Sequence, residues 1–74
     1  MNKPIPLIIE KDETGFYVIE CPLFAGCYSQ GKTITEATKN FKEVFGLILE
    51  EDENQQVWQN YQPESITFKT ITYA

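Results

Sequence analysis

The chain begins with a period of two, in which apolar side chains recur at Ile5, Leu7 and Ile9. This alternation predicts a strand that buries one of its faces. Pro6 lies inside the run and has no backbone N–H to give to a neighbouring strand. The first strand is therefore expected at a sheet edge.

Two further strands are predicted before any helix. The polar run 11–15 ends in glycine and precedes the aromatic and β-branched run 16–21, which is typical of a hairpin whose glycine takes a positive φ. Residues 22–26 have Pro and Gly at their ends, and a short third strand follows at 27–30, stopped by Gly31. These segments predict an antiparallel meander.

A long helix is predicted to begin near Ile34. Thr33 followed three residues later by Glu36 fits a capping box. One stripe of apolar residues at helical spacing then predicts packing on the sheet: Ile34, Ala37, Phe41, Val44, Phe45, Ile48 and Leu49. Gly46 costs about 1 kcal/mol relative to Ala in a helix, which favours close packing of another element there. Residues 50–53 are all acidic and oppose the helix dipole, so the helix is expected to stop close to Asp52.

The last third of the chain gives weaker signals. Residues 54–61 carry Val57, Trp58 and Tyr61 at helical spacing, which predicts one or two helical turns before Pro63. Residues 65–73 read as a final strand whose alternation slips by one residue at 69–70. The predicted fold class is α+β: a three-stranded antiparallel meander, one long helix packed on it, a short second helix and a C-terminal strand.

The length, charge and composition of the chain limit the functions that it can have. With 74 residues, 42% hydrophobic and 23% charged, the chain is expected to form a single domain over 1–74. A domain this small is marginally stable alone, which favours a homodimer or homotetramer. The net charge of −5 and the pI near 4.5 disfavour direct nucleic-acid binding. The absence of His removes the commonest general base and metal ligand.

Cys21 and Cys27 are the two cysteines of the chain. The N-terminus shows no secretion signal and no apolar run reaches about 18 residues, so a cytoplasmic protein with reduced thiols and no membrane association is expected. A redox pair or half of a metal site is one interpretation, but neither cysteine stands in a Cys-x-x-Cys motif at a helix start. Packing of two small apolar thiols is the favoured one.

Acidic and aromatic residues supply the candidate interface. Glu10 and Glu20 fall in predicted strands while Asp12 and Glu13 fall in a hairpin loop, a spacing that does not favour the carboxylate cluster of a metal-dependent nuclease. Neither catalysis nor a cofactor is therefore predicted. The functional hypothesis for these four acids is a docking face for a basic partner. The alternative is that they only make the surface soluble and protect the sheet edge. The aromatic residues without a certain core position are Phe24, Tyr28, Trp58 and Tyr61, and Phe24 and Tyr28 join Glu10, Asp12 and Glu13 as the expected partner interface.

Between about Leu7 and Leu49 an ordered set of short motifs resembles the N-terminal domain of HicB-family antitoxins. The motif residues are Gly15, Cys21, Pro22, Gly26, Cys27, Gln30, Gly31, Glu36 and Ala37. The sequence departs from the family at 23–25, where Leu-Phe-Ala replaces its usual polar residue and Pro. The resemblance implies a partial RNase H-like fold and binding to a small basic HicA toxin, an mRNA-cleaving protein. Because the chain ends at Ala74 without the helix-turn-helix or ribbon-helix-helix module of longer members, operator binding is not expected.

The leading hypothesis is thus a stand-alone HicB-like antitoxin domain, which is no enzyme and neutralises a HicA-like toxin. The alternative is a toxin-independent, homo-oligomeric structural or regulatory module built by pairing edge strands or the final strand between protomers. A degraded metal-dependent nuclease is the third hypothesis, distinguished by magnesium- or manganese-dependent RNA cleavage.

Overall fold

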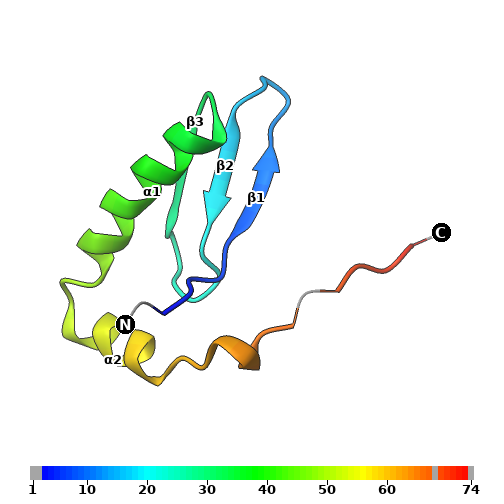
Figure 1. Cartoon of the computed structure of the whole chain (residues 1–74). Helices are drawn as coiled ribbons and strands as arrows, with labels where there is room; N and C mark the ends of the chain where they lie inside the picture. The colour runs from blue at the N-terminus through cyan, green and yellow to red at the C-terminus, as the bar shows by residue number, and fades with distance from the viewer. Residues whose placement is uncertain (1–2, 68, 74) are drawn as a thin grey trace.

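The computed structural model describes residues 3–67 and 69–73. A three-stranded antiparallel sheet in the order β1-β2-β3 is packed on one face by the longer of two helices (Figure 1). The elements are β1 (Ile8–Lys11), β2 (Tyr17–Glu20), β3 (Tyr28–Gly31), α1 (Ile34–Ile48), α2 (Asp52–Asn60) and the 3-10 helix η1 (Pro63–Ser65). The α+β prediction is confirmed, including the short second helix.

The β1–β2 hairpin is built around Asp12. Its Oδ1 accepts hydrogen bonds from the Thr14 hydroxyl at 2.7 Å and from the backbone N–H groups of Thr14 and Phe16 at 2.9 Å each. Gly15 adopts a φ of 91°, as predicted, which a side chain would oppose. The hydrogen bond to the Thr14 hydroxyl is the main reason that the pKa of Asp12 lies below its usual value. The carboxylate therefore shapes the turn.

Helix α1 begins where the capping box predicts. The Thr33 hydroxyl accepts the Glu36 N–H at 3.0 Å, and the Lys32 N–H points at the Glu36 carboxylate at 3.4 Å. The helix is then tied to β3, because the buried Ser29 hydroxyl donates to the Ala37 carbonyl at 2.8 Å. These contacts fix the helix over β3 and β2.

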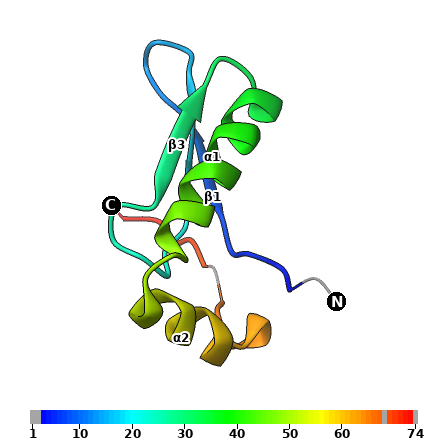
Figure 2. The ribbon, with the colours of Figure 1, turned by 90° about the vertical axis from the view of Figure 1, so that its left-hand side faces the viewer.

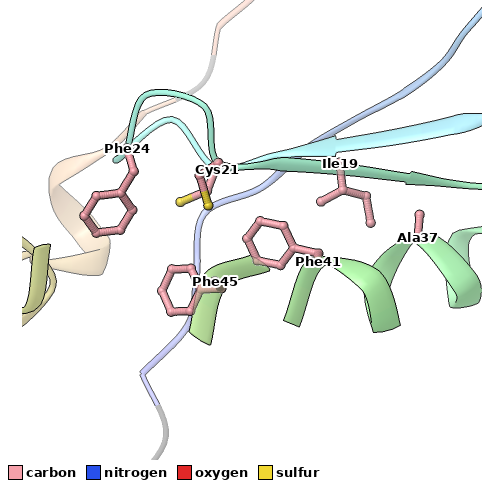
Figure 3. Close-up of a cluster of buried hydrophobic side chains, with 7 residues drawn as sticks. Ile19, Cys21, Phe24, Ala37, Phe41 and Phe45 are labelled. Carbon is pink, nitrogen blue, oxygen red and sulfur yellow. The ribbon is translucent and has the colours of Figure 1, made fainter. Parts of the chain in front are cut away.

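The core lies between α1 and the sheet. Figure 3 shows Phe41 and Ala37 of the helix facing Ile19 and Cys21 of the second strand and its end. Fully buried side chains are Ile19, Cys21, Cys27, Ala37 and Phe41. The predicted helical stripe is confirmed at its centre, although Ile34 is 48% exposed at the first turn.

A chain of aromatic rings joins α2 to this core. Phe45 of α1 contacts Trp58 edge-on at a centroid distance of 5.3 Å, and Trp58 stacks on Tyr61 at 5.8 Å. The Lys3 ammonium lies 4.8 Å from the Trp58 ring centroid and donates to the Trp58 carbonyl. Each ring contributes apolar area together with an edge-to-face or stacked contact, so the second helix closes one end of the core.

The four acids at 50–53 belong to a helix junction. Helix α1 ends at Ile48, four residues before the expected stop at Asp52, and α2 starts at Asp52 with Glu53 also in its first turn. There the helix dipole favours negative charge. The sequence interpretation assigned these carboxylates to the end of one helix, whereas two of them stabilise the start of the next.

The predicted C-terminal strand is not formed in the part of the chain that the structure describes. Pro63–Ser65 form a 3-10 turn, and residues 66–67 and 69–73 belong to neither helix nor strand, while position 68 lies outside the described residues. Ile71 is 80% exposed and Tyr73 96% exposed. The sequence at 65–73 does alternate between apolar and polar residues. A strand forms, however, only beside a neighbouring strand that pairs with its backbone groups.

The surroundings of Gly46 differ from the prediction. Close packing at this glycine was predicted, but a Cβ built there meets nothing within 4 Å. The Gly46→Ala substitution should therefore raise the free energy of unfolding by about 0.5–1 kcal/mol, because only the helical entropy cost of glycine is removed. Urea unfolding followed by circular dichroism tests this, and an unchanged or lower midpoint would contradict it.

Candidate functional site: the open face of the sheet

One face of the sheet is buried under α1 and the other is left uncovered. Ile19, Ser29 and Gly31 point toward α1 and are buried. The opposite face carries the alternate residues of the three strands and points away from α1, which lies in front of the sheet in Figure 2. Its residues, called here the open face, are Ile8, Glu10, Val18, Glu20, Tyr28 and Gln30.

The strand register sets the geometry of the open face. Ile8 lies opposite Glu20, and Glu10 lies opposite Val18, so that the four line a shallow hollow. Glu20 also lies opposite Tyr28 on β3. Directly opposed side chains on neighbouring strands have Cβ atoms about 4.5–5.5 Å apart. Two carboxylates therefore flank an apolar pair, with a tyrosine ring beside one of them.

This arrangement is suited to a cationic, partly apolar partner. Ionised carboxylates only accept hydrogen bonds, and they pair with Lys and Arg. Ile8 and Val18 are only partly buried, and Tyr28 is 59% exposed, so apolar surface remains to be covered. The open face thus offers both the charge and the aromatic anchor that interfaces use.

The predicted interface residues do not all gather there. Glu10 and Tyr28 lie on the open face, and the exposed Asp12 and Glu13 lie in the hairpin loop at its end. Phe24 does not expose the surface expected at its loop tip, because it is 9% exposed and packs edge-on against Phe45 at 6.0 Å. A loop that turns its apolar ring inward covers the end of the core.

Three members of the open face were missed as interface candidates: Ile8, Val18 and Gln30. Glu20 was considered with the acidic docking face but was not included in the expected interface. The signal that could have found them is the alternation within each strand. Once Ile19 is placed in the core, the even-numbered positions of β2 must face the other way. Trp58 is half-buried and Tyr61 is 9% exposed, so neither extends this surface.

The residues of the family motif lie at turns, at strand ends and at the start of α1. Gly26 turns the chain with a φ of 74° before Cys27, and Cys27 pairs with Cys21 through a backbone hydrogen bond of 2.9 Å. The Gln30 carbonyl accepts the Asn40 side-chain amide at 2.9 Å, and Pro22 lies exposed in the loop. Gly15, Gly31, Glu36 and Ala37 form the turn and helix-start contacts.

The two cysteines are free and buried. Burial raises the pKa of the Cys27 thiol to about 11 and also raises that of Cys21. Thiols of this kind are poor nucleophiles at neutral pH, because the thiolate is the reactive form. Their position is that of packed core side chains.

This raised pKa predicts a pH dependence of stability. Between the ordinary thiol pKa of 9.0 and about 11, Cys27 ionises in the unfolded chain while it stays protonated in the folded one. Stability is therefore lost as the pH rises through that window. A Cys27→Ala variant should lose less of its own stability between pH 9 and 11 than the parent does, measured by urea unfolding at each pH. Parallel stability curves would contradict the assignment.

The described residues hold neither a metal-binding cluster nor a membrane-spanning helix. Within 3–67 and 69–73, no three His, Cys, Asp or Glu side chains are grouped to hold a metal ion. No helix in the same part of the chain is long and apolar enough to cross a bilayer.

Comparison with known proteins gives the family. A family described as "HicB_like antitoxin of bacterial toxin-antitoxin system" matches residues 5–71. The chain belongs to this HicB-like antitoxin family. It is also 51% identical over 54 residues to a UPF0150 protein of Synechocystis, an alignment covering 72% of this chain and 78% of the relative. A UPF0150 protein of Archaeoglobus fulgidus is 42% identical over 48 residues, 65% of this chain and 70% of the relative.

Membership in the HicB-like family confirms the resemblance drawn from the motif residues and supports an antitoxin role in a toxin-antitoxin system. No solved structure matches the chain, so the partial RNase H-like description stays a prediction.

Proposed function

We propose that this HicB-like domain neutralises a HicA-like, mRNA-cleaving toxin by covering its RNA-binding surface with the open face of the sheet. The observation that carries the proposal is the pairing of family membership with an uncovered face that presents Glu10 and Glu20 around an apolar hollow. The domain acts by binding, without catalysis or a cofactor, in the cytoplasm.

Charge complementarity supports this choice of face. A protein that cleaves RNA needs a cationic surface for the phosphate backbone. The chain carries a net charge of −5, and the open face and the adjoining hairpin loop hold four of its eleven acids, namely Glu10, Asp12, Glu13 and Glu20. Carboxylates on a sheet occupy the toxin surface that would otherwise hold phosphates, and opposite fields also raise the association rate.

Apolar contact supplies the rest of the affinity. The side chains of Ile8 and Val18 line the hollow, and the exposed ring of Tyr28 stands beside Glu20. Aromatic residues near the centre of an interface dominate binding energies, whereas charges at its rim mainly set rate and specificity. A lysine or arginine stem of the toxin fits between the two carboxylates, with its apolar part on the Ile–Val pair.

The direct experiment is inhibition of the RNA cleavage that a purified HicA-like toxin carries out. Purified toxin should cleave an mRNA substrate alone and lose that activity on addition of the domain in equimolar amount. A Glu10→Lys, Glu20→Lys double variant should need at least about tenfold more protein for the same inhibition, since about 1.4 kcal/mol of binding energy corresponds to tenfold in affinity.

The matched control is Glu43→Lys, Glu50→Lys. Both acids are exposed and lie on or just after α1, away from the open face. The control and the test variant have the same net charge, so a general loss of attraction would weaken both equally. Equal inhibition by the test variant and the parent would refute the open face as the docking site. Failure of the parent itself to bind or inhibit would refute the proposed function.

A further inference from the structure

The outer edge of β1 is an unpaired strand edge. The Asp12 N–H donates to the Phe16 carbonyl at 2.8 Å, and hydrogen-bonded pairs alternate along an antiparallel ladder. Ile8 and Glu10 therefore direct their backbone groups to β2. Ile9 and Lys11 direct theirs outward, where the described residues supply no partner.

The other edge of the sheet is partly occupied. The same alternation turns the backbone groups of Tyr28 and Gln30 outward from β3, because Cys21 and Cys27 form a hydrogen-bonded pair. The Tyr28 N–H donates to the Gly26 carbonyl at 3.1 Å, and the Asn40 amide donates to the Gln30 carbonyl at 2.9 Å. Asn40 thus holds α1 against this edge, so β1 is the more open edge for a further strand.

Apolar surface accompanies the free edge. Helix α1 packs on β3 and β2 but not closely on β1, which leaves Ile9 47% exposed on the helix side of the sheet. Pro6 does not weaken the outer edge, because an even-numbered position continues the row that faces β2. A strand added here would gain backbone hydrogen bonds and cover Ile9.

The chain also carries a strand without a sheet. Seven of the nine residues at 65–73 are β-branched or aromatic, a composition typical of strands. In Figure 1 this orange-to-red segment leaves η1 and runs outward from the body rather than along β1. Its side chains Ile71 and Tyr73 are 80% and 96% exposed. A strand of eight residues would span about 26 Å and would be longer than the four-residue β1.

We propose that residues 66–73 of one copy add as a fourth strand to the outer edge of β1 in a second copy. Each copy then offers one free strand and one free edge, so the exchange is reciprocal and closes as a two-fold dimer. The added strand comes from a second copy because the segment runs away from β1 of its own chain. An identical β1 edge is present on the other copy. The added strand lies beside the sheet, so the open face stays free for a toxin.

Light scattering of the purified full chain over a range of concentrations tests the proposal. The parent should be a dimer, and the Thr70→Pro, Ile71→Pro double variant should be a monomer with an unchanged circular dichroism spectrum. Adjacent residues of a strand point their N–H groups to opposite sides, so this pair removes a donor to β1 in either register. Lys11→Pro removes an outward N–H of the edge itself and should also give a monomer.

Two controls separate this exchange from other contacts. Leu47, on α1, is 66% exposed, and Leu47→Asp should leave the dimer intact, whereas a dimer held by the helix surface would dissociate. Mixing the tail variant with Lys11→Pro should restore association, since one supplies an intact edge and the other an intact strand. A monomeric parent, or a tail variant that remains dimeric, would overturn the proposal. Protection of the tail amides from exchange in a monomer would show pairing within one chain instead.

Discussion

Replacing Phe41 with alanine should leave the domain largely unfolded at 25 °C. Phe41 is 1% exposed and lies at the centre of the core, stacked on Phe45 at a centroid distance of 5.7 Å. Truncating a buried phenylalanine costs about 3–5 kcal/mol through lost transfer energy and the cavity left behind. A single core in a chain of this size rarely supplies more than about 3–5 kcal/mol in total. The substitution therefore removes nearly all of the stability.

Urea unfolding at a fixed protein concentration measures the effect, because association contributes to apparent stability. Val57→Ala is the matched control, since Val57 is 44% exposed on α2 and its truncation should shift the midpoint little. A cooperative transition for the Phe41 variant, with a midpoint close to that of the parent, would show that the core is not organised around this ring.

The second large effect is expected at Gly31. A Cβ added there would lie 2.5 Å from the backbone nitrogen of Ala37 and 3.0 Å from its Cα. Backbone cannot swing aside as a flexible side chain can, so α1 would have to lift from β3. Gly31→Ala should lower the free energy of unfolding by about 1–3 kcal/mol, the usual cost of forcing extra atoms into a packed interior.

Gly46→Ala is the control for the same chemical change, because its Cβ meets open space. The two alanines should act in opposite directions, Gly31→Ala lowering and Gly46→Ala raising the urea midpoint. Equal shifts would mean that the contact between β3 and α1 does not oppose a Cβ at position 31.

The sequence predicted best where local signals and tertiary contacts agree. The capping box placed the start of α1 at Ile34 because the Thr33 cap and the Phe41 stripe both require it. Gly15 was predicted correctly because a tight hairpin demands a positive φ that no neighbour alters. The strands were found within one to three residues at their ends, and Ile9 failed as a buried residue because α1 does not reach β1.

The errors come from contacts between distant segments. Phe24 looked exposed in an apolar loop, but its partner Phe45 lies far away in the chain and draws it inward. The alternation at 65–73 predicted a strand, yet among the described residues of this segment none pairs with an edge of the sheet. Glu20 was noted as a carboxylate but not joined to Tyr28, because only the register shows them side by side. The hydrophobic pattern of the sequence predicts which face of each element is apolar. The tertiary contacts between elements determine which of these faces pack together.

The central claim is that the open face binds a toxin, and amide NMR of the isotope-labelled chain tests it most directly. On titration with a purified HicA-like toxin, the amides of Ile8, Glu10, Val18, Glu20 and Tyr28 should shift or broaden together, while the exposed positions of α1 stay in place. Perturbation confined to α1, with the sheet amides unmoved, would contradict the account.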